Sequence, residues 1–519
     1  MSTYELGDAP PGRSLGLGFV EAAARPGARV ALSEAAWARI ASARAVVERY
    51  LDGDEPVYGL NTGLGGNVGF RLSRADIEAF QVQMVRGRCI GVGEPFPEGV
   101  ARLMLLCRLI GLARGGSGIS PAVLDLMVAM FNAGITPVIP GRGSIGAADL
   151  GLCAHMGLAA IGRGEVFVGG ERRPAAAALA AAGLGPARLG PKDGLALLNS
   201  SAVGCGHATS VLRDWADLAL VSVATAALSC EGYAANLCVF DARLARARPA
   251  GGQERAAALF RAALEDSSLH APGAARAIQD ALSFRTLSQV YGTALTAFEA
   301  AVESVETEID SAADNPLVLA EDGLILSTAN FHTPAIALAF DALAIVGAHL
   351  ATGAAFRAAK LMDARLSGLP KYLSPVGGAA NGFNSLQKTA ASLHAEARLK
   401  ATPASLDALP VSETVEDHAP QTPLTIRKLA EQIEPLRLLV AVEALVAAQA
   451  VDLRAPPRLA AATRVLQEAI RAEVPMLTED RETGPDVDRV ANLLRSPALI
   501  ERLRSVLGEV GRDTFDLRT

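Results

Sequence analysis

The second half of the chain carries long apolar stripes at helical spacing. Leu295, Phe298, Val302 and Val305 recur at steps of three or four residues. Apolar residues at this spacing line one face of an amphipathic helix and leave Glu303, Glu306 and Glu308 for its other faces. Similar Ala/Leu-rich stretches predict helices over 253–266, 288–310, 333–362, 376–400, 424–453 and 458–473. Because few loops separate these stretches, we expect them to pack together in an elongated bundle rather than to lie as unrelated surface helices.

The first half of the chain has a different pattern. Shorter helical stretches alternate with connectors rich in glycine and proline, such as 53–69 and 137–146, where turns form easily and loops present side chains. At 519 residues the chain is longer than one compact core usually serves. We therefore predict a loop-rich N-terminal domain over 1–240, whose loops can carry a site, and a long helical bundle with C-terminal helices over 241–519.

Composition supports a mainly α protein. Half of the residues are hydrophobic but only 4% are aromatic, so the apolar content is mostly Ala, Leu and Val, which suits close-packed helices. The net charge of -7 gives no electrostatic footprint for nucleic acid. The apolar run 438–451 is too short to span a bilayer before Asp452 and Arg454 interrupt it, so we expect no membrane partner.

The cysteines and the N-terminal residues indicate the cellular compartment in which we expect the protein. The six cysteines show no Cys-x-x-Cys spacing of the zinc or redox kind. The N-terminus lacks a basic region followed by an apolar stretch, which an export signal would need. We expect a soluble cytoplasmic protein with reduced thiols.

Seven short motifs, in order and at consistent spacing, resemble the landmarks of the aromatic amino acid ammonia-lyases, the family of histidine and phenylalanine ammonia-lyase. Each motif alone is weak evidence, but the ordered set covers most of the chain. The motifs are Tyr58 to Gly65, Gln81 to Glu94, Gly194 to Asn199, Gln279-Asp280 with Ser283 to Arg285, Asp314-Asn315-Pro316, Asn330-Phe331-His332, and Pro403 to Ser405 with Glu416-Asp417-His418. The resemblance implies a histidine ammonia-lyase-like fold, a small-molecule substrate, and a homotetramer whose active sites are shared between subunits.

The segment from Arg142 to His155 resembles the family's signature loop. In the family, an Ala-Ser-Gly tripeptide in this loop cyclises and dehydrates into the electrophile methylidene-imidazolone. Here the corresponding positions are Ala147, Ala148 and Asp149, and the loop is one residue short. Without the serine and the following glycine the group cannot form, so we expect no prosthetic group and no other cofactor.

The resemblance also assigns roles to polar residues. Tyr58 matches the tyrosine that removes a β-proton, a role for which a phenol needs neighbouring positive charge; the alternative is a tyrosine that packs against a turn. Arg285 matches the carboxylate-binding arginine, whose planar fork suits that partner. Asn199, Gln279 and Asn315 match amides that position the substrate, although each fits an ordinary cap or turn, Asn315 above all because it precedes proline.

Further residues join this predicted site. Asn61 lies in the tyrosine loop as a candidate substrate contact, and Phe331 offers an aromatic face to a cation. Glu416 matches the glutamate that approaches the substrate ring or amine, and an internal salt bridge is its alternative. His418 resembles a structural histidine, because no second ligand stands at metal-binding spacing around it. We therefore expect no metal.

At four positions the sequence differs from the family pattern, and these differences change the expected lining of the pocket. Arg88 stands where histidine-specific lyases have a histidine, Leu282 replaces a tyrosine, and Val415 stands where an amide is common. Lys388 stands where the family usually has an apolar residue on a buried helix. A buried lysine needs a negative partner, so we expect it to face a carboxylate, a phenolate or an anionic atom of the substrate, and the resemblance makes it a candidate catalytic residue. Its alternative is to point outward into solvent.

The expected absence of methylidene-imidazolone indicates which kind of amine the substrate releases. The electrophile captures a substrate through a free electron pair, and a quaternary ammonium has none. The pattern is therefore similar to the ergothioneine trimethylammonia-lyases, a subfamily that lacks the group and converts ergothioneine into thiourocanate and trimethylamine. On this interpretation Tyr58, Lys388 and Glu416 are catalytic. Elimination from another betaine or histidine-like amino acid, and an inactive binding or scaffold protein, remain alternatives.

Overall fold

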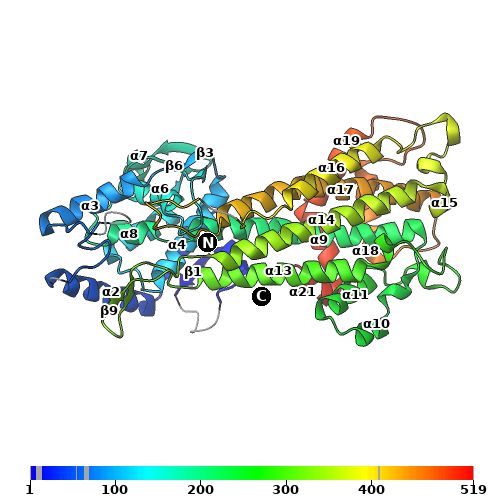
Figure 1. The fold of residues 1–519 in the computed structure, drawn as a ribbon. Coiled ribbons are helices and arrows are strands. Elements are labelled where there is room, and N and C mark those ends of the chain that lie inside the picture. The colour runs from blue at the N-terminus through cyan, green and yellow to red at the C-terminus, as the bar shows by residue number, and fades with distance from the viewer. Residues whose placement is uncertain (1, 8–13, 54, 64–68, 407–408, 518–519) are drawn as a thin grey trace.

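A computed structural model describes residues 2–7, 14–53, 55–63, 69–406 and 409–517. The fold is elongated and mainly α, as the composition predicts: a lobe of short helices and small sheets stands at one end, and long helices run from it to the other end (Figure 1). The last two residues of the tyrosine motif, Leu64 and Gly65, lie outside the described residues.

The bundle is built from long helices that pack side by side. They are α9 (Ala202–Tyr233), α13 (Leu287–Ile309), α14 (Pro334–Met362), α16 (Leu386–Lys400) and α17 (Thr422–Arg454). The most extensive contacts join α17 to α9 and to α14. Every residue of α17 from Leu439 to Val451 is buried, so the apolar run 438–451 lies in the central helix of the core.

The N-terminal lobe surrounds the near ends of these helices. Its helices are α1 (Leu17–Ala24), α2 (Glu34–Asp52), α3 (Arg74–Gly87), α4 (Glu98–Ala113), α5 (Pro121–Asn132), α6 (Leu150–Ala160), α7 (Ala175–Ala181) and α8 (Asp193–Leu198). Its strands are β1 (Thr3–Leu6), β2 (Arg29–Leu32), β3 (Val92–Pro95), β4 (Thr136–Pro137), β5 (Pro140–Arg142), β6 (Glu165–Val168) and β7 (Glu171–Pro174). Strands β1 and β2 are parallel, whereas the β3–β5 and β4–β6–β7 sheets are antiparallel. The antiparallel hairpin of β8 (Leu317–Leu319) and β9 (Leu324–Leu326) contacts α2.

Short elements complete the fold around the long helices. They are η2 (Leu237–Phe240), α10 (Ala242–Ala247), α11 (Gly251–Ala263), η3 (Ser268–His270), α12 (Leu282–Arg285), α15 (Ala364–Ser367), η4 (Lys371–Leu373), η5 (Gly377–Ala379), α18 (Ala461–Glu473), α19 (Gly484–Leu494), α20 (Pro497–Val506) and α21 (Gly508–Asp513). Helix α11 packs along α13, and α18 packs against α9 and α20.

The helices predicted in the second half are confirmed except for the stretch 376–400. There the helix begins only at Leu386, because the preceding residues turn. Gly377 has a φ of 79°, and the backbone amides of Asn381 and Gly382 donate to the Asp480 carboxylate at 2.7 and 2.9 Å. Helix α9 was not predicted as part of the bundle, so the bundle draws on both sides of the predicted boundary at residue 240.

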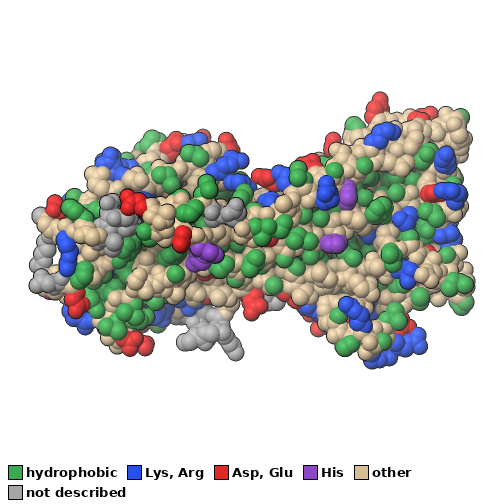
Figure 2. Space-filling view, viewed as in Figure 1, with side chains coloured by type: hydrophobic (Ala, Val, Ile, Leu, Met, Phe, Trp, Pro, Cys, Tyr) green, Lys and Arg blue, Asp and Glu red, His purple; other side chains and the backbone are tan. Residues whose placement is uncertain are grey.

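Two observations concern apolar surface. Helix α14 is long and apolar enough to cross a membrane by length and composition, but 56% of its most apolar window is buried, as in a core helix. Leu338, Ile345 and Phe356 on α14 and Leu399 on α16 are nevertheless exposed. Figure 2 shows hydrophobic side chains along the middle of the bundle surface. Within the described residues of one chain, these side chains remain uncovered.

Candidate active site

The loop from Arg142 to Asp149 is held firmly by its last residue. The Asp149 carboxylate is buried and accepts hydrogen bonds from the Ser144 hydroxyl at 2.6 Å and from the Gly204 amide, in the first turn of α9, at 2.7 Å. The Asp149 amide donates to the Ser200 carbonyl at 2.8 Å. Burial raises the pKa of Asp149, and the two bonds to its carboxylate oppose that change. The loop is therefore a folded part of the lobe, with Ala148 buried at a φ of 54°.

Two later segments of the chain lie against this loop. Ala147 forms an isolated antiparallel bridge with His332, and the Gln421 amide donates to the Ile145 carbonyl at 2.9 Å. The rings of His332 and His418 are joined by a hydrogen bond of 2.9 Å between Nε2 and Nδ1. The motifs that contain Phe331 and Glu416 are thus brought to the loop. No group of three or more metal-ligating side chains occurs among the described residues.

Arg88 lies close to two predicted catalytic residues. It is half-buried at the end of α3, just before strand β3, which pairs with β5 and so adjoins the loop. Burial lowers the pKa of the Arg88 guanidinium, whereas the nearby Tyr58 and Glu416 favour its charged form. A positively charged residue that departs from the family pattern therefore lies near Tyr58 and Glu416.

The turn that carries Tyr58 is organised by the amide of Asn61. The Asn61 Oδ1 accepts from the Val57 amide at 2.8 Å, and its Nδ2 donates to the Glu55 carbonyl at 2.8 Å. Both ends of this side chain are therefore engaged in holding the turn. Its predicted role as a substrate contact stays a prediction, and its observed role is to support the half-buried Tyr58.

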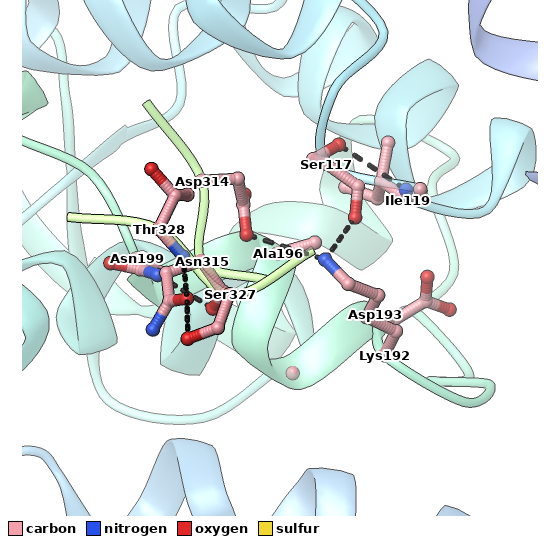
Figure 3. Close-up of polar contacts among 12 residues, drawn as sticks. Ser117, Ile119, Lys192, Asp193, Ala196, Asn199, Asp314, Asn315, Ser327 and Thr328 are labelled. Atoms are coloured by element: carbon pink, nitrogen blue, oxygen red, sulfur yellow. Dashed lines mark hydrogen bonds and ion pairs between the residues drawn. The ribbon is translucent and has the colours of Figure 1, made fainter. Parts of the chain in front are cut away.

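Asn199 and Asn315 contact each other directly. The Asn199 Nδ2 donates to the Asn315 carbonyl at 2.8 Å, and the Asn315 Oδ1 accepts from the Thr328 amide at 2.9 Å (Figure 3). Asn199 is buried at the end of α8, directly before the start of α9. Together with the Asp149 to Ser200 bond, this contact places both amides beside the loop.

Gln279 and Arg285 form a second, distant group. With the Gln279 amide in its hydrogen-bonding orientation, its oxygen accepts from Nη1 and Nη2 of Arg285 at 2.5 and 3.3 Å. Phe284 stacks on Tyr233, the last residue of α9, with ring centroids 4.3 Å apart. Since α9 has 32 residues, its length separates this group from Asn199 by about 48 Å.

Lys388 also lies away from the loop. It is exposed in the first turn of α16, in the outward orientation that was the alternative, and it makes no ion pair with any residue in the described part of the chain. Gln387 beside it lines a cavity of about 620 Å³ with Asp363 and Lys371. One chain therefore brings Tyr58, Asn61, Arg88, Asn199, Asn315, Phe331 and Glu416 to one end, and leaves Gln279, Arg285 and Lys388 in the other half.

A half-buried acid beneath the loop was missed from the sequence. Glu308 lies on a face of α13 away from its apolar stripe, as the periodicity predicts, but that face meets the start of α9. The Ser201 hydroxyl donates to the Glu308 carboxylate, and burial raises the pKa of Glu308 to about 7. Helical periodicity carries no signal for this contact, because it does not reveal which neighbour covers a polar face.

Comparison with known proteins agrees with the whole architecture. Residues 15–472 match the aromatic amino acid lyase family. The chain is 40% identical to histidine ammonia-lyase of Gloeobacter violaceus, over 96% of this chain and 98% of that protein, and 39% identical to histidine ammonia-lyase of Symbiobacterium thermophilum, over 96% and 98%.

Solved structures give the same result. The crystal structure of ergothionase from Treponema denticola, an ergothioneine-degrading enzyme in complex with desmethyl-ergothioneine sulfonic acid, superimposes with a TM-score of 0.92 at 32% identity, over 96% of this chain and 99% of that one. Histidine ammonia-lyase from Trypanosoma cruzi superimposes with a TM-score of 0.88 at 32% identity, over 98% and 96%. The protein has a histidine ammonia-lyase-like fold and belongs to the aromatic amino acid lyase family.

Proposed function

We propose that this lyase eliminates trimethylamine from ergothioneine to give thiourocanate, without a methylidene-imidazolone group. The observation that carries the proposal is the loop at Ala147, Ala148 and Asp149. These three positions hold no serine for dehydration, and Asp149 is fixed by hydrogen bonds from Ser144 and Gly204. The similarity to the Treponema denticola ergothionase supports the choice of substrate.

The reaction needs only a base and a good leaving group. The Tyr58 phenolate takes the β-proton, the electrons of the C–H bond form the carbon–carbon double bond, and the carbon–nitrogen bond breaks with its electron pair leaving on nitrogen. Because that nitrogen carries three methyl groups, it departs as neutral trimethylamine. Arg88 lies near Tyr58 and Glu416, which favour its charged form, so it brings positive charge to the base.

Other residues bind the rest of the substrate. Arg285 holds the carboxylate with Gln279, which already contacts its guanidinium. Asn199 and Asn315 orient the same end of the substrate, and Phe331 offers a ring face to the quaternary ammonium. Lys388 supplies positive charge to the thioimidazole as electrons flow into it.

These roles require more than one copy of the chain. The length of α9 separates Arg285 from Asn199 by about 48 Å, so no substrate touches both within one chain. The exposed apolar residues Leu338, Ile345 and Phe356 on α14 offer a surface for a second copy. We therefore propose a homotetramer in which each active site takes Tyr58 from one subunit and Arg285 from another.

A substrate panel tests the function. Purified protein is incubated separately with ergothioneine, histidine and histidine betaine, while trimethylamine, ammonia and the absorbance of the conjugated product are followed. Trimethylamine from ergothioneine alone is expected. Ammonia from histidine would overturn the proposal in favour of the activity named for the Gloeobacter and Symbiobacterium relatives. Release from histidine betaine alone would indicate another betaine, and an inert protein would indicate a scaffold.

The absence of the prosthetic group has its own test. The peptide that contains Ala147 to Asp149 is isolated by proteolysis and its mass is measured. The expected mass is that of the unmodified sequence. A mass reduced by the loss of water would reveal cyclisation and would remove the chemical reason for a quaternary substrate.

A further inference from the structure

Three charged side chains, Lys192, Asp314 and Arg108, form a buried triad directly behind the two asparagines of the site. Lys192 Nζ lies 3.3 Å from Asp314 Oδ1 and donates to the Ser117 carbonyl at 2.5 Å, and Arg108 Nη2 lies 3.2 Å from Asp314 Oδ2 (Figure 3 shows the lysine side). All three side chains are at most 4% exposed. Burying charged side chains costs desolvation free energy, so a buried cluster of three charges needs a structural or functional explanation.

The cluster holds more positive than negative charge. Asp314 faces two cations, and the neighbouring carboxylate of Asp193 is already bound by Ser120, by the Gly190 amide and by Arg44. Burial lowers the pKa of Lys192, the nearby Arg108 adds to that change, and Asp314 opposes it. Lys192 also has a left-handed backbone, with φ at 69°, which is strained for a lysine.

The triad joins the two segments that carry the amides. Asp314 directly precedes Asn315, while Arg108 also donates to the carbonyl of Ala196 in α8, the helix that ends before Asn199. The Asp314 carboxylate, which is shared between Lys192 and Arg108, thus fixes the position of Asn315 relative to Asn199.

Each asparagine keeps one end of its amide unused. Asn315 Nδ2 and Asn199 Oδ1 make no hydrogen bond with any residue that the structure describes. The first is a donor suited to a carboxylate, and the second is an acceptor suited to an N–H group. An amide selects between such ligands only if its partner bonds prevent it from rotating or shifting.

We propose that Lys192, Asp314 and Arg108 are positioning residues that hold the Asn199–Asn315 pair ready for the carboxylate end of an amino-acid-derived substrate. The proposal rests on the proposed function for its substrate, but the geometry of the amides can be tested without it. The triad does not touch the reacting atoms; it acts through the asparagines.

A double-mutant cycle measures this coupling. Lys192→Met leaves Asp314 paired with Arg108, so the remaining charges balance. It is expected to raise KM for ergothioneine about tenfold with kcat changed less than about threefold. In the Asn315→Ala background the same substitution is expected to change KM less than about twofold, because the residue through which it acts is gone. Should Lys192→Met not fold, Lys192→Gln replaces it, keeping a donor for the Ser117 carbonyl without the charge.

The control is Arg471→Met, which breaks the 2.7 Å pair with Asp452 far from the loop and is expected to leave KM unchanged. Equal KM changes in both backgrounds would overturn the proposal. A crystal structure of the lysine variant gives a second readout, in which the Asn199 Nδ2 to Asn315 O contact is expected to lengthen or break. An unchanged contact would also overturn the positioning role, whatever the substrate. A wild-type protein inert towards ergothioneine would overturn only the proposed function.

Discussion

Asn199 and Arg285 stand at opposite ends of the same helix. Asn199 lies three residues before the first residue of α9, and Arg285 follows Phe284, which stacks on Tyr233, the last residue of α9. The helix holds them about 48 Å apart. The two ends of the predicted substrate site therefore cannot close on one ligand within a single chain.

Complementation between inactive variants tests this consequence. Tyr58→Phe and Arg285→Met are each expected to be inactive alone. Mixed tetramers formed by co-expression in equal amounts are expected to recover about a quarter of wild-type activity, because one site in four then receives both intact residues. Trimethylamine release from the mixed protein is the measurement.

The matched control combines two lesions from the same end of the chain. Tyr58 and Arg88 interact within one subunit, so each site draws both from the same copy. Tetramers mixed from Tyr58→Phe and Arg88→Met are therefore expected to stay inactive. Recovery in this control, or none in the first mixture, would contradict shared active sites.

Loss of the Tyr58 hydroxyl isolates the proton-transfer step. Tyr58→Phe keeps the ring and the packing of the turn but removes the proposed base, so kcat for trimethylamine release is expected to fall by about 10² to 10⁴. Tyr50→Phe, a neighbouring tyrosine on α2, is expected to keep full activity. An undiminished kcat in the Tyr58 variant would exclude this residue as the base.

The Asp149 carboxylate is expected to stabilise the loop and the start of α9 together. Asp149→Ala leaves the buried Gly204 amide and the Ser144 hydroxyl without their acceptor, at an expected cost of about 1–3 kcal/mol in the free energy of unfolding. Denaturant unfolding measures this, and Asp322→Ala at an exposed position serves as the control. A loss for Asp149 no larger than for Asp322 would mean that these bonds do not hold the loop.

The raised pKa of Glu308 leads us to predict that the free energy of unfolding depends on pH. Its folded pKa of about 7 exceeds the ordinary value of 4.5, so the folded state binds more protons than the unfolded state between these values. Stability contributed by the protonated group is therefore lost as pH rises from about 4.5 to 7, by up to about 3 kcal/mol. Glu308→Gln is expected to flatten the thermal stability profile over this range.

Glu303→Gln, on an exposed position of the same helix, provides the comparison for that profile. It is expected to keep the wild-type pH dependence. If the two variants gave the same profile, the burial of Glu308 would not be the cause.

The sequence by itself determined the helical second half, the order of the family motifs and the altered loop. These features depend on residue type and on local spacing, as in the stripe of Leu295, Phe298 and Val302, or in the absence of a serine at Ala148. Local spacing does not show long-range contacts. The turn near Gly377 is held by the distant Asp480, so the sequence pattern did not predict this break in the helix.

Only the tertiary structure decided which polar residues meet. Spacing in the chain did not reveal that Arg88 lies near Tyr58 and Glu416, or that Glu308 lies beneath the loop. Nor did it reveal that a 32-residue helix separates Arg285 from Asn199. Such contacts depend on how whole helices pack against one another, and helical periodicity identifies the buried face without naming its partner.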